Sequence, residues 1–443
     1  MVKKMGFARK HLSADGLIKA VRNSLYKENL PECNKSNISW QDCTMSGLAI
    51  FGLKFPSLLQ FEENKEDKVI KKNLKNLYKV NHVPSDTCLR ERLDKLSPDN
   101  FRRPFRTIFA FLQRGKVLER YLYFNKYYII SVDGTGQFSS NKVHCKNCCE
   151  KHHRNGDVTY YHHMLGASIV HPDEKVVIPL APEPIVKGDG NTKNDCERNA
   201  SKRLLKDFRR EHPHLKAIIV EDALSSNYPH LSLLDELNLQ YIIGVKPGDH
   251  EYLFDWINTA KGKEFSLTKN KIKHKFRYVK DVPLNDENYD YRVNVLEYWE
   301  EKPNGKKQHF SWVTSFEITD ENAFDLMRAG RSRWKIENET FNTLKNQGYN
   351  FEHNYGHGDN NLCSVMGMLM LLAFLIDQVQ WLCCGLYKKL KKKKGPWYAV
   401  FESIRSMFFM IIWDDWQQMY ETILNPKEHP PPNWFGVPIS VNE

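Results

Sequence analysis

The chain has 443 residues, of which 41% are hydrophobic, and its formal net charge at pH 7 is +11. This length is ample for a large core and roughly two to four domains, and the basic excess favours a polyanionic partner. The ten cysteines do not form a disulfide framework in a chain this long, and residues 1–6 lack an apolar signal core. We therefore expect a cytoplasmic protein.

Residues 1–125 are predicted to be mostly helical, with polar connections. Ser13 or Asp15 can cap a helix near the start, and Ser85 or Asp86 can cap another that carries Arg90 and Arg92. More basic residues follow closely: Arg102, Arg103, Arg106, Arg114 and Lys116. This region is the best candidate for nucleic-acid binding, although a helical packing domain with a solvated basic face would have the same pattern.

From residue 126 onward, apolar runs typical of strands alternate with helical segments, which predicts an α/β fold. Residues 126–246 would form the first part of a core and 309–400 the second. Between them, residues 247–308 show short polar-apolar alternation and are predicted to be a β-rich insertion. Residues 401–443 are predicted to hold a C-terminal helix and a Pro-rich tail.

One long apolar stretch, residues 362–386, could be mistaken for a membrane span. Asp377 and Gln378 interrupt it and leave a run shorter than the roughly 18–20 residues that a span needs, so we predict a buried core helix. The lysine-rich segment 388–394 follows directly. It is predicted to be either a solvated helix end that complements the helix dipole or a phosphate-contacting patch.

Three acidic residues stand where an active site would be expected. Asp133 and Asp222 each end an apolar run typical of a strand, and Glu337 lies in a segment typical of a helix. Ligands in α/β folds bind outside the carboxyl ends of the strands, so these side chains can converge there. Gathered carboxylates repel one another unless cations lie between them, which favours a site with two Mg²⁺ ions about 3.5–4 Å apart for phosphodiester chemistry.

Each acidic residue also has a simpler interpretation. An aspartate at a strand end often caps the next loop, and Arg333 with Glu337 could be an ordinary i,i+4 ion pair. Glu221 precedes Asp222, but adjacent strand residues face opposite ways, so Asp222 beside the loop is the better candidate. Four other acidic residues could replace one of the three: Asp157, Asp189, Glu197 and Glu339.

Three local sequences carry a resemblance to a known family: residues 131–135 (SVDGT), 219–227 (IVEDALSSN) and 333–338 (RWKIEN), the last with Phe341, Leu344 and Lys345. Over residues 126–385 the chain resembles DDE-type bacterial insertion-sequence transposases. The resemblance implies a ribonuclease-H-like (retroviral-integrase-like) core with a β-rich insertion before the last carboxylate and a helical N-terminal domain. It also implies that Asp133, Asp222 and Glu337 are catalytic and hold Mg²⁺ or Mn²⁺.

The same resemblance implies a function and partners. The family binds double-stranded DNA at the terminal inverted repeats of its element, cleaves it and transfers the ends to target DNA, in a dimer or larger synaptic complex. This would place the protein on the bacterial nucleoid within the cytoplasm. Two alternatives are a structure-specific DNA nuclease on the same core and a non-catalytic, sequence-specific DNA-binding descendant, although the intact carboxylates argue against the second.

The chain departs from the family pattern around the final glutamate. The family usually has a tyrosine seven residues before this glutamate, where this chain has Gly330, and a lysine seven residues after it. Here Lys345 is eight residues after Glu337, which moves it by about a quarter turn on a helix. The predicted phosphate or DNA contacts are Arg333, Lys345, Trp334, Asn338, Arg90 and Arg92. Trp334 could instead be a packing residue, or it could stack on a flipped base.

A second cluster lies between residues 144 and 153, where a Cys-x-x-Cys pair is followed by histidines. Cys145, Cys148, His152 and His153 are candidate ligands of a structural Zn²⁺. Because these ligands crowd into a short stretch, His162, His163 or Cys196 could complete the site. The alternative is a reduced hairpin without metal.

Overall fold

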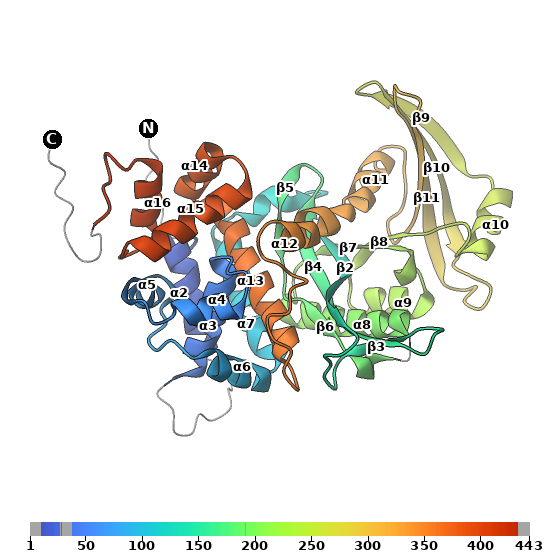
Figure 1. The fold of residues 1–443 in the computed structure, drawn as a ribbon. Helices are drawn as coiled ribbons and strands as arrows, with labels where there is room; N and C mark the ends of the chain where they lie inside the picture. The colour runs from blue at the N-terminus through green and yellow to red at the C-terminus, as the bar shows by residue number, and fades with distance from the viewer. Residues whose placement is uncertain (1–9, 27, 29–37, 191, 433–443) are drawn as a thin grey trace.

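The computed structural model describes residues 10–26, 28, 38–190 and 192–432. Two parallel strands lie at its centre, β2 (Tyr127–Ser140) and β7 (Ala217–Glu221). Residues 129–132 of β2 and all of β7 are buried. Continuous apolar runs of this kind are typical of strands that are covered on both faces of a sheet. The two runs therefore form the centre of the core, and both end at the same edge of the sheet (Figure 1).

The core of the sheet consists of three antiparallel strands, of which β2 is one, and two strands parallel to β2, of which β7 is one. β4 (Val158–His171) runs antiparallel to β2, and β5 (Glu174–Pro179) runs antiparallel to β4. On the other side, β8 (Gln240–Gly244) runs parallel to β7. The connecting helices are α8 (Lys193–Glu211) and α9 (Tyr228–Glu236). This topology is that of a ribonuclease-H-like core, as the sequence predicts.

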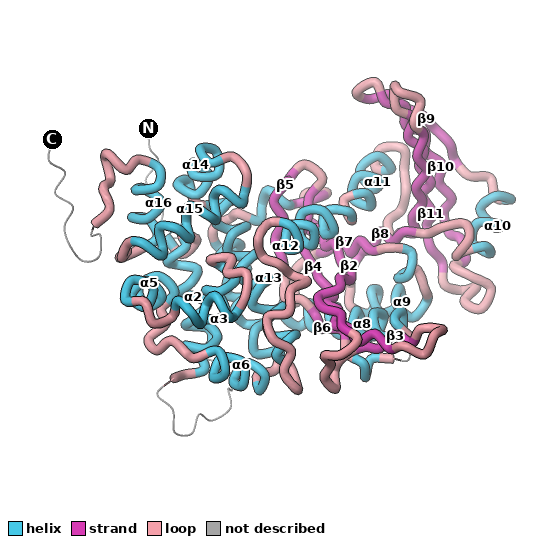
Figure 2. Tube along the Cα trace, viewed as in Figure 1, coloured by secondary structure: helices cyan, strands magenta, loops and turns pink. Residues whose placement is uncertain are grey.

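The predicted β-rich insertion is confirmed, and it continues the same sheet. β12 (Lys307–Thr314) runs antiparallel to β8 and is followed outward by three long strands: β11 (Arg292–Glu301), β10 (Ile272–Pro283) and β9 (Lys263–Lys269). Within the described residues, twelve strands belong to one sheet, including the short β1 (Leu122–Tyr123), β3 (Cys149–His152) and β6 (Glu183–Ile185). The insertion also contains a helix that was not predicted from the sequence, α10 (Glu251–Thr259). The insertion as a whole projects from the core (Figure 2).

The N-terminal region is helical, as predicted. Its helices are α2 (Ala14–Leu25), α3 (Trp40–Gly52), α4 (Leu58–Asn64), α5 (Lys68–Tyr78), α6 (Asp86–Lys95) and α7 (Arg102–Arg114), and two short 3₁₀ turns cover Pro98–Phe101 and Leu118–Tyr121. Ser13 accepts a hydrogen bond from the Gly16 amide at 3.2 Å, and Ser85 accepts one from the Cys88 amide at 3.2 Å. The serine is thus the N-cap of both predicted helices.

Helices from the other end of the chain complete this helical lobe. They are α13 (Leu362–Cys383), α14 (Gly385–Lys394), α15 (Trp397–Met410) and α16 (Trp416–Leu424). α13 packs on α3, α15 on α5 and α16 on α2, so the two ends of the chain lie side by side (Figure 1). The Asn73 side chain donates to the carbonyls of Phe408 and Ile411, both at 2.7 Å, and joins α5 to the end of α15.

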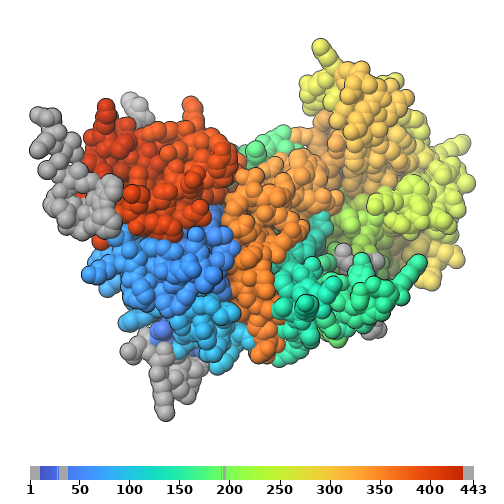
Figure 3. All heavy atoms as spheres, in the orientation of Figure 1, coloured from blue at the N-terminus to red at the C-terminus, as the bar shows by residue number. Residues whose placement is uncertain are grey.

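The apolar helix α13 is a core helix, as the sequence predicts. It is long and apolar enough to cross a membrane, but 94% of its most apolar stretch is buried inside the protein. It contacts α3 and α6 on one side and β5 on another. In the space-filling view the segment that contains it runs between the helical lobe and the sheet (Figure 3). The lysines of residues 388–394 lie on α14, directly after this core helix.

Candidate active site

The first two carboxylates lie just beyond the stretch in which the two central strands pair in parallel: Asp222 directly follows β7, whereas Asp133 lies within β2, which continues to Ser140 and does not end at Asp133 as predicted. Asp133 follows the buried residues of β2, and its Oδ1 accepts a hydrogen bond from the Gly134 amide at 2.8 Å. Asp222 directly follows β7, and its Oδ1 accepts one from the Leu224 amide at 3.0 Å. Because β2 and β7 pair in parallel, both residues reach the same edge of the sheet. The two carboxylates line one groove of about 790 Å³.

Glu221, the acidic neighbour of Asp222, has a different environment. Its carboxylate is buried, and Oε2 lies 2.5 Å from Nε2 of His230 on α9. Ser201 of α8 lies 3.4 Å from its other oxygen. Glu221 therefore packs between the sheet and its covering helices, whereas Asp222 lies on the groove, as expected from alternation along a strand.

Glu337 is presented by a helical segment that crosses the sheet edge. After α11 (Ala323–Arg331) a tight turn leads into a stretch of π-helix, Ile336–Phe341, and then α12 (Asn342–Asn346). π-helical turns are rare and frequent at functional sites. The segment contacts β2, β4 and β5, and Thr340 Oγ1 lies 3.3 Å from Ser168 Oγ of β4.

Two glycines allow this close packing. A Cβ atom at Gly166 of β4 would lie 2.8 Å from the ring of Phe341, so a side chain there would push the Glu337-bearing segment away. A Cβ at Gly330 would lie 2.7 Å from the indole nitrogen of Trp312 on β12. The indole of Trp312 thus occupies the space that a side chain at position 330 would need.

Arg333 joins two of the three carboxylates. Its Nη1 lies 2.7 Å from Oδ2 of Asp133, and its Nη2 lies 2.6 Å from Oε1 of Glu337. The Arg333 carbonyl accepts a hydrogen bond from the Ser131 hydroxyl at 2.8 Å, which fixes the turn to β2. The guanidinium thus bridges two carboxylates with one nitrogen on each, which its planar fork allows and a single lysine ammonium does not reproduce.

The electrostatics of the site show an excess of negative charge. Burial raises the pKa of Asp133 to about 7; the Arg333 guanidinium opposes this effect, and the charges of Glu337 and Asp222 add to it. A carboxyl group with a pKa raised in this way is stabilised in its charged form by any further cation placed beside it.

The groove has contributions from beyond the core. Glu197 of α8 lines it with Asp133 and Asp222, and a Cβ at Gly134 would lie 3.1 Å from the Glu197 carboxyl group. Lys246, His250 and Asn285 line it from the segment after β8 and from the insertion. Glu197 is one of the four alternative acidic residues and is the one placed in this groove. Asp189 instead pairs with Arg203.

The other predicted DNA contacts have varied surroundings. Trp334 and Asn338 are exposed on the Glu337-bearing segment, with Trp334 44% exposed. Lys345 forms an ion pair with Glu352 at 2.7 Å. On α6, Arg90 is exposed and paired with Asp86 at 2.5 Å, whereas Arg92 donates to the Ile38 carbonyl and lies 5.4 Å from the Trp40 ring centroid.

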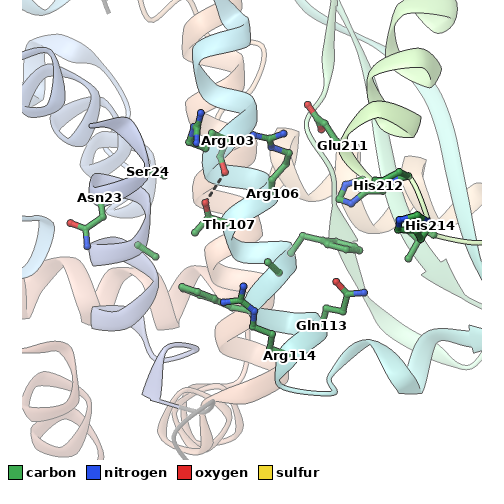
Figure 4. A pocket seen from close by; sticks show the side chains of 16 residues that line it. Asn23, Ser24, Arg103, Arg106, Thr107, Gln113, Arg114, Glu211, His212 and His214 are labelled. Atoms are coloured by element: carbon green, nitrogen blue, oxygen red, sulfur yellow. Dashed lines mark hydrogen bonds between the residues drawn. The ribbon is translucent and has the colours of Figure 1, made fainter. Parts of the chain in front are cut away.

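The arginines of α7 divide into two groups. Arg102 is buried among Glu183, Asp207 and Glu211, so it is a packing residue. Arg103, Arg106 and Arg114 line a pocket of about 610 Å³. Their side chains lie along α7, opposite His212 and His214 of the loop after α8 (Figure 4).

A family model described as a transposase DDE domain matches residues 180–375. The match supports the predicted resemblance to DDE-type transposases over this part of the chain. Among solved structures, the chain is similar to the piggyBac transposase in a synaptic complex with hairpin DNA, determined by cryo-EM. The identity is 9% and the TM-score 0.39, with 96% of this chain and 82% of that chain covered. No match is found among curated proteins.

The matched segment of the chain contains Asp222 and Glu337, whereas Asp133 lies before it. Asp133 is connected to the matched segment by its ion pair with Arg333 and by the parallel pairing of β2 with β7. The arrangement can therefore gather hard oxygen ligands from three separate parts of the chain, the donor set that Mg²⁺ and Mn²⁺ prefer.

The ligand set predicted for zinc needs a correction. His152 lies 3.3 Å from Glu150 with its side chain 71% exposed, and His153 Nε2 lies 2.9 Å from Thr159 Oγ1. Neither histidine approaches the cysteines, because residues 149–152 form β3 and carry both of them away along the hairpin.

The cysteines instead gather a different pair of histidines. Cys145 and Cys148 lie with His162 and His357, and the candidate ligand atoms are all within 4.8 Å of one another. His162 is one of the completing residues considered from the sequence, whereas Cys196 lies 3.4 Å from the Gly190 carbonyl, and neither it nor His163 belongs to the group. His357 was missed, since nothing in the sequence connects it with a pair some 200 residues earlier.

Proposed function

We propose that this chain is the transposase of an insertion sequence. It binds the terminal inverted repeats of its element as double-stranded DNA, cleaves at the element ends and joins each freed 3′-hydroxyl to target DNA. The observation that carries the proposal is the pairing of Asp133 and Glu337 through Arg333, with Asp222 at the same sheet edge. A structural ion pair between Arg333 and two carboxylates would not require a third carboxylate, Asp222, on the same groove as Asp133.

Asp133, Asp222 and Glu337 would hold two divalent cations, Mg²⁺ or Mn²⁺. The residues fit such ions, because all three offer carboxylate oxygens, and the pKa of Asp133 is raised first by burial and then by the charges of Glu337 and Asp222, effects that a bound cation would oppose. Bound ions would activate the attacking water or 3′-hydroxyl and stabilise the leaving oxygen of an in-line displacement.

Arg333 would have two successive partners. Its guanidinium now compensates Asp133 and Glu337, a role that divalent cations would assume. It would then be free to bind a phosphate beside the scissile bond in bidentate fashion. The Ser131 hydroxyl, which holds the Arg333 backbone against β2, would keep the guanidinium at the site during this exchange.

Further DNA contacts would come from exposed residues around the groove. Trp334 and Asn338 flank Glu337, with Trp334 available for stacking on a base, and Lys345 follows on α12. In the helical lobe, Arg90 with Arg106 and Arg114 would contact the phosphate backbone. Cutting two element ends together would require a dimer or larger complex, working on the nucleoid in the cytoplasm.

The proposal is tested with labelled DNA that carries the ends of the element, incubated with Mg²⁺ or with EDTA. Wild-type protein is expected to cut at the element boundary only with Mg²⁺ and to join the ends to a target plasmid. The Glu337→Gln variant should bind the DNA but not cut it. Glu339→Gln is the matched control, because this glutamate lies on the same helical segment outside the Arg333 ion pairs, and it should cut normally.

Each contrary result points to a specific alternative. Cleavage by Glu337→Gln at the wild-type rate would contradict the assignment of Glu337. Cleavage without joining would indicate a structure-specific nuclease, and binding without cleavage by wild-type protein would indicate a non-catalytic DNA-binding descendant.

A further inference from the structure

A compact group of sulfur and nitrogen atoms lies apart from the carboxylate site. The sulfurs of Cys145 and Cys148 are 3.9 Å apart. Cys145 Sγ lies 3.3 Å from Nε2 of His162, and Cys148 Sγ lies 3.2 Å from Nε2 of His357. Cys148, His162 and His357 are buried, and Cys145 is half-buried. The four candidate ligand atoms thus surround one small, largely buried space, in which all of them lie within 4.8 Å of one another.

These spacings match a tetrahedral metal centre. Zinc bonds of about 2.3 Å to sulfur and 2.0–2.1 Å to nitrogen, at tetrahedral angles, place two sulfurs roughly 3.8 Å apart and a sulfur and a nitrogen roughly 3.5 Å apart. A disulfide would need the sulfurs at about 2.05 Å. The two cysteines are free thiols in the structure, so the Cys-x-x-Cys turn has the geometry of a chelate.

His357 has one ring nitrogen without a partner. Within the described residues, Nδ1 of His357 is buried and has no hydrogen-bond partner, and its Nε2 lies 3.2 Å from the Cys148 sulfur, a weak donor. His162 and His357 lie edge to face, with ring centroids 4.9 Å apart, and Phe138 packs against His357 at 4.8 Å. Two buried imidazoles that face two thiols are better satisfied by a shared cation than by one another.

We propose that Cys145, Cys148, His162 and His357 bind one Zn²⁺ ion in a structural site. Four protein ligands close the coordination shell and leave no position for substrate, which distinguishes this site from a catalytic zinc. Binding would displace the two thiol protons, since zinc is bound by thiolates. The inference is independent of the proposed function, because it uses none of the three carboxylates.

The site would fasten together three parts of the fold. The Cys-x-x-Cys turn follows β2, the strand of Asp133; His162 belongs to β4; and His357 lies between α12 and α13. Contacts between these parts already exist, since Gln137 donates to the Cys363 carbonyl at 2.6 Å and Lys146 to the Asn360 side chain at 2.7 Å. A zinc ion there would hold the chain after the Glu337-bearing segment against the hairpin that extends from the Asp133 strand.

The first test measures bound metal in the purified full-length protein by mass spectrometry after exhaustive dialysis. Wild-type protein is expected to hold one zinc per chain, and Cys148→Ser or His357→Asn should reduce this at least tenfold. Cys149→Ser and His152→Asn are matched controls, one a neighbouring buried cysteine and the other a histidine predicted from the sequence. Both controls should keep the zinc.

A second measurement uses wild-type protein alone, in case the ligand variants do not fold. Chelator-stripped protein is titrated with Co²⁺, which should produce thiolate charge-transfer absorption and the intense visible bands of a tetrahedral ion at one equivalent. Addition of Zn²⁺ should abolish these bands and raise the melting temperature. Wild-type protein that contains no zinc and gives no tetrahedral cobalt spectrum would overturn the proposal, as would full zinc retention in folded Cys148→Ser or His357→Asn.

Discussion

Arg333 decides how the carboxylate site is arranged in the absence of cations. One guanidinium contacts both Asp133 and Glu337, and its backbone carbonyl is held by Ser131. A lysine at this position would keep the charge but could not contact two carboxylates in the same fork geometry. The side chain's shape is therefore as important as its charge.

We predict that Arg333→Lys lowers the rate of DNA-end cleavage on the order of tenfold to a hundredfold, because phosphate and carboxylate contacts change from bidentate to single. Single-turnover cleavage with Mg²⁺ measures the effect. Arg328→Lys is the matched control, because Arg328 lies on α11 and pairs with Asp173 away from the groove. Equal rates for wild type and Arg333→Lys would show that the fork geometry is unimportant.

His212 is a partly buried base whose titration affects stability. Burial, together with the charges of Arg106 and Arg209, lowers the pKa of His212 to about 4. The imidazole packs on Phe109, with ring centroids 4.3 Å apart. The unfolded chain takes up this proton near the ordinary pKa of about 6.5, but the folded chain does so only near 4. The free energy of unfolding therefore decreases as the pH falls from about 6.5 to about 4, because only the unfolded chain binds this proton.

For wild-type protein we predict that this histidine removes up to about 3 kcal/mol of unfolding free energy between pH 6.5 and 4. In His212→Gln this part of the pH dependence should disappear, so that the variant loses less stability on acidification. Urea unfolding at several pH values measures the pH dependence of stability in wild-type protein and in His212→Gln. His214→Gln, at an exposed neighbouring position, should keep the wild-type dependence; if His212→Gln keeps it too, the partly buried imidazole is not its source.

Among the elements, α13 depends on a cap supplied from α6. Oδ1 of Asp94 accepts hydrogen bonds from the amides of Asn361 and Leu362 at 2.9 and 3.0 Å, at the start of the helix. Burial would raise the pKa of Asp94, but hydrogen bonds from Asn360 and from the backbone of residues 359–362 outweigh it and hold the pKa below its ordinary value. A carboxylate at this end also suits the helix dipole.

We predict that Asp94→Asn lowers the free energy of unfolding by about 1–3 kcal/mol, since an amide cannot replace all of these charge-assisted bonds. Because the folded pKa is depressed, the carboxylate's contribution is complete above its unfolded pKa and is lost as the pH falls through the folded one. Chemical unfolding at pH 7 tests the variant against Asp86→Asn, whose carboxylate pairs with Arg90 on the surface. A loss no larger than that of the control would contradict the capping role.

The same elements show what sequence patterns can and cannot predict. The strands that carry Asp133 and precede Asp222 were predicted because uninterrupted apolar runs are a strong local signal, but the end predicted at Asp133 was wrong, since β2 continues to Ser140. The helix α10 was missed because it was included in a stretch interpreted as strand-like alternation. Gly330 departs from the family pattern, but the indole of Trp312 that packs against it belongs to a strand that only the fold brings beside it.

At the scale of the whole molecule, the helical lobe and the sheet meet along α13. Helices from both ends of the chain form the lobe, while the core sheet continues without interruption into the insertion. Neither feature has a local sequence signal, because each depends on packing between segments hundreds of residues apart. His357 could not be predicted as a ligand for the same reason: it approaches Cys145, Cys148 and His162 only in the folded chain.

Asp133, Asp222 and Glu337, three carboxylates from distant segments, are proposed to form one metal-dependent nuclease site. The most direct measurement is DNA-end cleavage by Asp222→Cys with Mg²⁺ and with Mn²⁺, beside Asp222→Asn. Mn²⁺ accepts a thiolate ligand more readily than Mg²⁺ does. We predict that Asp222→Cys is inactive with Mg²⁺ and regains cleavage with Mn²⁺, whereas Asp222→Asn is inactive with both. Cleavage at the wild-type rate with Mg²⁺ by either variant would contradict the claim.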